Sequence, residues 1–320
     1  MPTRLIAPLV ALALVALFPL SGATFYVELT TKIMIMAIFA LSLDLLVGWT
    51  GLVSFGHAAF FGVGAYALAL LSPKAAATGL WSSLAVAVAA AALCAFVVGI
   101  FVLRTRGIYF IMVTLAFAQM FYFVFHDTNV GGGSDGRYVN VKPDASLFGF
   151  TPFDLDKPNQ IFYVVMAVLV LVFVFLQLLL RSPFGRALQG IRANEQRMRA
   201  LGYPVAAYKL AAFTLAGALA GLAGYLLAAQ SGFVNPEILS WHQSGNVLLM
   251  VILGGAGTPY GPIVGAFALT LLHEFFSSVT KHWQLFLGAT IVLIVLFMPG
   301  GLAHLVRRVR RGLFGSSGDG

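Results

Sequence analysis

The sequence predicts an all-α bundle of about ten transmembrane helices, and three observations support that prediction. The 320 residues are 60% hydrophobic and only 9% charged, whereas a soluble domain has roughly 25% charged residues. Several runs without Asp, Glu, Lys or Arg approach or exceed the roughly 20 residues that a helix needs to cross the hydrocarbon. These runs are residues 75–103, 107–125, 158–180, 210–236 and 284–306. They are continuously apolar, which excludes barrel strands, and only helices satisfy their own backbone groups in lipid.

Ten spans are expected along the chain. They lie approximately at residues 5–20, 33–49, 54–72, 80–103, 107–125, 160–180, 210–230, 243–257, 261–279 and 284–303. The first has Arg4 before it and small residues after it, as a cleaved signal sequence does. We expect an uncleaved span there, because the remainder of the chain is membrane protein throughout. The third is interrupted by glycines, and the tenth ends at Met298-Pro299-Gly300-Gly301, which is typical of a helix stop.

The basic residues predict how the chain is threaded. Thirteen of the nineteen Lys and Arg lie in four segments: Arg4, Arg104 with Arg106, residues 181–209, and Arg307 to Arg311. Ten crossings put all four segments on one side, which the positive-inside rule makes cytoplasmic. The longest loop on the other side contains five Asp against three basic residues. We therefore expect one transmembrane domain over 1–320, with an extracytoplasmic loop at 126–159, a cytoplasmic segment at 181–209 and a cytoplasmic tail at 304–320.

The cytoplasmic segment is predicted to form a short amphipathic helix or a helix pair. Pro183 is typical of a helix start, and Gly202 with Pro204 is typical of a helix end. Apolar residues between them recur at helical spacing, and arginines and Glu195 occupy the other positions. Such a helix lies on anionic lipid or docks a cytoplasmic partner, and these residues alone favour neither.

A glycine-broken stretch from Asp44 to Tyr66 is the candidate substrate pathway. Non-helical backbone at membrane depth is tolerated where it is buried in protein or lines a water-filled cavity, and ionisable groups there usually face a bundle interior. The alternative is that Asp44 and His57 only form hydrogen bonds between helices. A metal role for His57 is not expected, since no further ligands lie nearby. The candidate pathway residues are Asp44, Gly51, Ser54, Gly56 and His57.

Glycines at a spacing of four residues predict close contacts between helices. They are Gly217, Gly221, Gly257, Gly261 and Gly265. No Gly-Lys-Ser/Thr follows the later group, so it does not match a nucleotide-binding loop. The sequence also lacks His-Glu-x-x-His, a nucleophile elbow and Cys-x-x-Cys, and its one cysteine, Cys94, lies in an apolar run. Neither an enzyme nor a metal site is predicted.

Four ordered stretches together resemble a known family. They are residues 44–66, residues 104–119, the glycine-rich turn Gly131 to Gly136, and residues 181–265. They resemble the permease subunits of branched-chain amino-acid ABC importers, of the M type of the Liv system. The resemblance covers nearly the whole chain.

The resemblance implies a fold of the ABC importer permease type and a set of partners. Such a permease lies in the bacterial inner membrane beside a second homologous permease subunit, above two cytoplasmic ATP-binding subunits, and receives its cargo from a periplasmic substrate-binding protein. ATP is used by those partners, so no cofactor is expected in this chain and no nucleic acid is bound. The segment from residue 186 to 202 matches the region that couples the permease to the ATPase. The implied coupling residues are Arg186, Arg192, Asn194, Glu195, Arg199 and Gly202.

Two alternatives to an amino-acid importer remain at this point. Related permeases carry urea or short amides, and the binding protein usually sets the selectivity. A secondary transporter driven by an ion gradient is disfavoured, because Asp44 and His57 are the only pair of ionisable groups suited to it.

Overall fold

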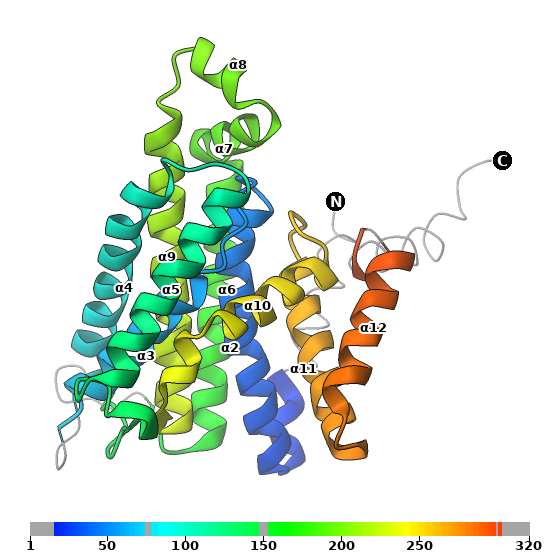
Figure 1. Cartoon of the computed structure of the whole chain (residues 1–320). Helices are drawn as coiled ribbons and strands as arrows, with labels where there is room; N and C mark the ends of the chain where they lie inside the picture. The colour runs from blue at the N-terminus through cyan, green and yellow to red at the C-terminus, as the bar shows by residue number, and fades with distance from the viewer. Residues whose placement is uncertain (1–15, 74–77, 147–152, 299, 303–320) are drawn as a thin grey trace.

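The computed structural model of the chain describes residues 16–73, 78–146, 153–298 and 300–302. These ranges contain eleven α-helices, shown in Figure 1: α2 (Thr24–Val47), α3 (His57–Leu71), α4 (Leu80–Val102), α5 (Ile108–Asp127), α6 (Pro158–Arg181), α7 (Pro183–Ala193), α8 (Glu195–Ala200), α9 (Val205–Ser231), α10 (Trp241–Gly254), α11 (Gly261–Val279) and α12 (Trp283–Phe297). Short 3-10 helices lie at η1 (Phe18–Ser21), η2 (Gly133–Asp135) and η3 (Pro236–Leu239). The strands β1 (Arg137–Tyr138) and β2 (Phe233–Val234) form one antiparallel pair.

Six of these helices are long and apolar enough to cross a membrane, namely α2, α4, α5, α6, α9 and α11. Helices α3 and α12 are apolar but have only 15 residues each. The helical membrane bundle is thus confirmed, whereas the number of ten crossings stays a prediction. Most of the expected first span, 5–20, and the predicted tail, 304–320, lie outside the described residues.

Several helix boundaries differ from the sequence prediction, and two of these differences have a direct physical reason. Helix α2 begins at Thr24 rather than near residue 33, because Glu28 and Lys32 are exposed on its first turns and do not interrupt it. Helix α3 begins only at His57. The preceding stretch is not helical, and Gly51 adopts a positive φ of 75°, which glycine reaches without a steric penalty.

Helices α2 and α9 form the centre of the bundle. Every residue of α2 from Ile33 to Leu46 is buried, as expected of a helix that is apolar on all sides. Helix α9 packs against α2, α3 and α4 (Figure 1). The outer helices keep apolar side chains exposed, such as Leu171 on α6 at 67% and Phe297 on α12 at 79%. Such surfaces require lipid or a partner protein as their surroundings.

Small residues bring the central helices close together. A Cβ added at Gly217 or Gly221 on α9 would overlap the methyl groups of Ala95 or Ala91 on α4. One at Gly265 on α11 would overlap the Met250 carbonyl on α10. At Gly261, the added atom would overlap the Thr258 side chain and the Gly255 carbonyl, within the turn between α10 and α11. The helices therefore approach more closely than any larger side chain permits.

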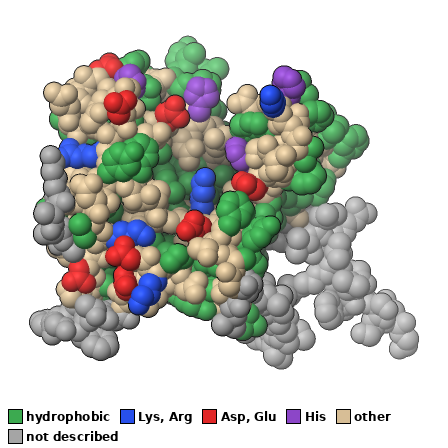
Figure 2. Space-filling view, turned by 90° about the horizontal axis from the view of Figure 1, so that it is seen from below, with side chains coloured by type: hydrophobic (Ala, Val, Ile, Leu, Met, Phe, Trp, Pro, Cys, Tyr) green, Lys and Arg blue, Asp and Glu red, His purple; other side chains and the backbone are tan. Residues whose placement is uncertain are grey.

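The two ends of the molecule differ. Helices α7 and α8 project at one end, together with the turn between α4 and α5 (Figure 1). Arg106 in that turn lies 3.8 Å from Glu195 on α8, so the two arginine-rich segments that the structure describes are at the same end. Figure 2 views the opposite end, where acidic, basic and histidine side chains are interspersed with hydrophobic ones.

Candidate functional site

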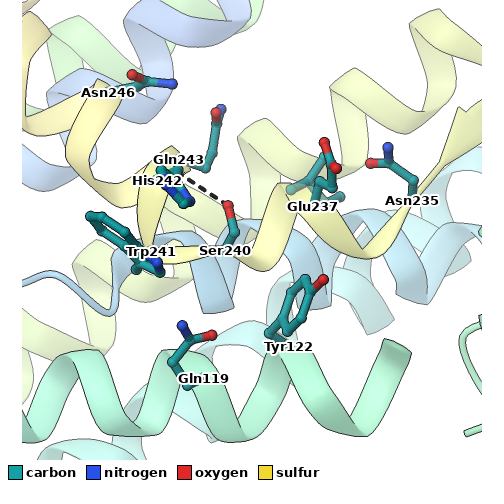
Figure 3. A pocket seen from close by; sticks show the side chains of 10 residues that line it. Gln119, Tyr122, Asn235, Glu237, Ser240, Trp241, His242, Gln243 and Asn246 are labelled. Carbon is teal, nitrogen blue, oxygen red and sulfur yellow. Dashed lines mark hydrogen bonds between the residues drawn. The ribbon is translucent and has the colours of Figure 1, made fainter. Parts of the chain in front are cut away.

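A cavity of about 550 Å³ lies between α5, η3 and the beginning of α10 (Figure 3). Gln119 and Tyr122 extend into it from α5, and the remaining lining follows β2 in the chain. The cavity is lined by Gln119, Tyr122, Asn235, Glu237, Ile238, Ser240, Trp241, His242, Gln243 and Asn246. Among the described residues, the lining has one carboxylate, Glu237, and no lysine or arginine.

Local sequence positions the wall formed by η3 and α10. Pro236 lies in the first turn of η3. Leu239, at the end of η3, is fully buried against Gly62 of α3, and a Cβ at position 62 would overlap the Leu239 side chain. The Ser240 hydroxyl caps α10 by accepting a hydrogen bond from the backbone amide of Gln243 at 3.4 Å. This cap starts the helix so that its polar first residues lie at the cavity.

The non-helical segment 48–56 and the first turn of α3 form hydrogen bonds to the two helices that contribute to the cavity. The Phe55 amide donates to the Thr114 hydroxyl on α5 at 3.1 Å, and the Ala58 amide donates to the Ser244 hydroxyl on α10 at 3.0 Å. Ser54 is fully buried and accepts a hydrogen bond from the Gly56 amide. The segment is therefore bound to α5, and the first turn of α3 is bound to α10.

The two ionisable residues of the predicted pathway are buried and hydrogen-bonded. Asp44 accepts hydrogen bonds from the Gly257 amide at 2.8 Å and the Trp49 indole at 3.1 Å. His57 shares a hydrogen bond between Nε2 and the Ser42 hydroxyl, 2.9 Å away. The bonds from Asp44 to Gly257 and from His57 to Ser42 join different segments of the bundle, which is what the alternative interpretation expects of these two residues. None of the five predicted pathway residues lines the large cavity, and their assignment to a pathway stays a prediction.

The segment 181–209 forms a helix pair in which α7 is amphipathic. The buried positions of α7 are Gly185, Ala187, Leu188 and Ile191, and Arg186 is exposed. Asn194 ends α7 and caps α8 by accepting a hydrogen bond from the Arg197 amide at 2.9 Å. Gly202 follows α8 with a positive φ of 84°.

Glu195 is the centre of a charge cluster on α8. Its carboxylate lies 2.7 Å from Lys209 on α9, 2.5 Å from Arg199 and 3.8 Å from Arg106. Burial by itself raises the pKa of Glu195, whereas the hydrogen bond from Lys209 lowers it. The positive charges of Lys209, Arg199 and Arg106 add to the lowering, so the pKa lies below its ordinary value. The carboxylate is therefore ionised and fixes α8 to α9 and to the α4–α5 turn.

Arg192 links α7 to the membrane helices. Its guanidinium donates to the Gly48 carbonyl at the end of α2. Gly48 in turn lies against Gly257, whose amide binds Asp44. One set of contacts therefore joins α7, the end of α2 and the turn between α10 and α11.

Sequence reasoning missed the residues of the cavity. Their signal is a cluster of polar residues within an apolar region, in which Asn235-Pro236-Glu237 is followed closely by the polar stretch Trp241 to Asn246. Gln119, inside an otherwise apolar helix, is the matching signal on α5. In the described ranges, no group of three or more His, Cys, Asp or Glu side chains is placed to hold a metal ion.

Comparison with known proteins identifies the family. Residues 25–295 match the family model described as branched-chain amino acid transport system / permease component. The chain is 34% identical to the high-affinity branched-chain amino acid transport system permease protein LivM of Escherichia coli, over 93% of this chain and 75% of that protein. It is 33% identical to the LivM protein of Salmonella typhimurium over the same shares.

More distant similarity extends to another import system. The chain is 28% identical to the autoinducer 2 import system permease protein LsrC of Photorhabdus laumondii, over 55% of this chain and 54% of that protein. No solved structure matches the chain. Because the family model spans α2 to α12 almost entirely, the chain belongs to the permease-component family of the branched-chain amino acid transport system.

Proposed function

We propose that this chain is a membrane-spanning permease subunit of an ATP-driven importer that carries branched-chain or similar amino acids across the bacterial inner membrane. The observation that carries the proposal is the family match over residues 25–295, which includes both the cavity and the α7–α8 segment. The relatives named for branched-chain amino acid transport cover most of the chain, which favours this cargo over urea or short amides.

The chain works with several partners in this proposal. A second homologous permease subunit stands beside it, two ATP-binding subunits lie beneath α7 and α8, and a periplasmic binding protein delivers the substrate. The exposed apolar surfaces of the outer helices and the projecting arginine-rich helix pair support this arrangement. Ten crossings, with α7 and α8 on the cytoplasmic side, are consistent with the positive-inside rule.

Helices α7 and α8 couple ATP use to movement of the bundle. Arg186, Asn194, Arg199 and Gly202 belong to the proposed contact with the ATPase, and Arg192 and Glu195 fix the helix pair to the rest of the chain. When ATP binding closes the ATPase pair, the helix pair moves as a rigid body and shifts the bundle between inward- and outward-open states. Coupling of this kind requires contacts that differ between the two states.

The substrate pathway follows the segment that joins α2 to α3. Asp44, Gly51, Ser54, Gly56 and His57 are its proposed residues. Support comes from two backbone hydrogen bonds. Phe55 in this segment donates to Thr114 on α5, and Ala58 in the first turn of α3 donates to Ser244 on α10, and both of these helices contribute to the cavity. A change in the segment would therefore alter the separation of the cavity walls.

Uptake by the complete reconstituted complex tests the cargo. Proteoliposomes containing both permease subunits, the ATP-binding subunits and the binding protein are given labelled leucine and an excess of unlabelled competitor. Unlabelled isoleucine or valine is expected to reduce the leucine signal, and urea is expected to leave it unchanged. Uptake of labelled urea without uptake of leucine would overturn the assignment to amino acids.

A further inference from the structure

The geometry points to the cavity between α5 and α10 as a site for the zwitterionic head of an amino acid in transit, with the Glu237 carboxylate accepting the ammonium group. This inference rests on the proposed function, because it assigns the cargo to particular side chains of this chain. It concerns a cavity built from two segments that lie more than a hundred residues apart in the sequence (Figure 3).

The charges of the lining select the class of ligand. In the part of the chain that the structure describes, Glu237 is the one carboxylate that lines the cavity, and neither lysine nor arginine lines it. An ammonium group donates up to three hydrogen bonds and pairs most strongly with an ionised acceptor. A lining with one negative charge and no fixed positive charge disfavours phosphates and dicarboxylates, and it suits a ligand that has an ammonium group and no net negative charge.

Glu237 is available to a ligand. Its residue is exposed, and its side chain forms no ion pair or hydrogen bond with the described residues. Glu195, in contrast, is enclosed by three basic side chains of the same chain. The Glu237 carboxylate therefore does not have to break a bond within the protein in order to bind an ammonium group.

The other lining groups match the remainder of an amino acid. Side-chain amides supply N–H donors for the carboxylate of the ligand, from Gln119, Asn235 and Asn246. Gln243 has two N–H donors and directs one at the Met36 sulfur, 3.8 Å away, which leaves the other for a ligand. The rings of Tyr122 and Trp241 and the side chain of Ile238 supply apolar surface for its side chain. A volume of about 550 Å³ falls within the range of roughly 300–1,000 Å³ typical of small-molecule sites.

The assignment distinguishes an amino acid from urea. Urea has amide donors but no positive charge, so it gains no charge-assisted hydrogen bond at Glu237. A leucine analogue with a hydroxyl group in place of the ammonium group, 2-hydroxy-4-methylpentanoate, loses the same bond and adds a net negative charge next to the carboxylate.

Protection of a cysteine in the cavity tests the site. The native cysteine is removed with Cys94→Ala, and a cysteine for labelling is introduced on α5 with Gln119→Cys. Labelling by a membrane-impermeant maleimide is followed in the complete complex with its binding protein. Leucine is expected to slow labelling, and 2-hydroxy-4-methylpentanoate is expected to leave it unchanged. Addition of Glu237→Gln should raise the leucine concentration needed for half-protection by about 10-fold or more, as expected for loss of a charge-assisted hydrogen bond.

Two control variants distinguish loss of the Glu237 charge from a general effect of the substitution on folding. Glu237→Asp keeps the carboxylate and is expected to retain protection better than Glu237→Gln. Glu28→Gln removes an exposed carboxylate outside the cavity and is expected to leave half-protection unchanged. If the complex with Cys94→Ala and Gln119→Cys takes up leucine but leucine does not slow labelling, the inference is overturned and the proposed function is not. Absence of leucine uptake by the parental complex would overturn the proposed function and the inference with it.

Discussion

At the scale of single residues, Glu195 concentrates the charge interactions of the chain. Three of the five ion pairs among the described residues involve its carboxylate. The Lys209 side chain is only 14% exposed and that of Arg106 is 68% exposed, so solvent screens the pair with Lys209 less than the pair with Arg106. The cluster therefore attaches α8 to α9 and to the α4–α5 turn.

Substitution of Glu195→Gln tests this role through its pH dependence. Because the pKa of Glu195 is lowered in the folded chain, its contribution is complete well above the ordinary value of 4.5. It is lost as the pH falls through the lowered pKa. At neutral pH the substitution should reduce stability by about 1 kcal/mol, measured as Tm in detergent. The gap between the variant and the parent should close on acidification below about pH 4.5.

An exposed carboxylate provides the matched comparison. Glu28→Gln removes a glutamate without an ion pair among the described residues, and its Tm should follow the parent at every pH. A constant gap between Glu195→Gln and the parent from neutral to strongly acidic pH would show that the ion pairs do not supply the stability.

Residue identities could be predicted from the sequence, but their partners could not. Asp44 and His57 are conspicuous as ionisable groups in an apolar region. One partner of Asp44, however, is the backbone amide of Gly257, which is 213 residues away. Arg192 likewise binds the Gly48 carbonyl, and no periodicity indicates a bond to a backbone group of a distant helix. Such contacts depend on how the helices pack, which local patterns do not specify.

At the scale of elements, the packing of α9 against α4 predicts a steep dependence on residue size. Gly221→Ala places a methyl group against that of Ala91, and the backbones must separate to accommodate it. We expect a loss of about 1–3 kcal/mol, as for other overpacked cores, measured as a fall in Tm of the purified subunit.

Gly288 on α12 is the control for this substitution. A Cβ there meets no atom within 4 Å, so Gly288→Ala should be neutral or stabilise by up to about 1 kcal/mol through higher helix propensity. Equal effects of the two substitutions would contradict close packing of α9 on α4.

The link from α7 to α2 makes a separate prediction about coupling. Arg192→Gln removes the guanidinium that donates to the Gly48 carbonyl and leaves Arg186 in place. The number of ATP molecules hydrolysed per leucine imported should rise severalfold, because closure of the ATPase pair would then move α7 without moving the end of α2. The ATP-binding subunits should still co-purify with this variant.

Arg186→Gln is the matched substitution on the outer surface of α7. It should weaken retention of the ATP-binding subunits, because Arg186 is exposed and belongs to the proposed docking surface. If Arg192→Gln instead released these subunits and left the hydrolysis ratio unchanged, Arg192 would belong to the docking surface and the proposed link would be wrong.

Element positions followed closely from the apolar runs, and element ends followed less well. The runs predicted where α4, α5, α6 and α9 lie, although α9 begins at Val205, five residues before the predicted span, and includes Lys209. They placed the start of α2 too late, because Glu28 and Lys32 are tolerated on exposed first turns. They also did not predict the β1–β2 pair, whose strands have only two residues each.

At the scale of the whole molecule, the composition of the chain and its family both indicate a membrane protein. The low charge content predicted a membrane bundle, and the match over residues 25–295 places the chain in a permease family. The cavity could not be predicted in the same way. Its walls come from Gln119 and Tyr122 on one helix and from residues 235–246 on another segment, which only the tertiary fold brings together.

The source of energy for uptake tests the central claim most directly. The complete complex is reconstituted in proteoliposomes, and the chain by itself is reconstituted in parallel. Leucine uptake is then measured with ATP and without an ion gradient, and also with an ion gradient and without ATP. The account predicts uptake only by the complete complex with ATP. Uptake by the chain alone, driven by a gradient in the absence of ATP, would contradict it.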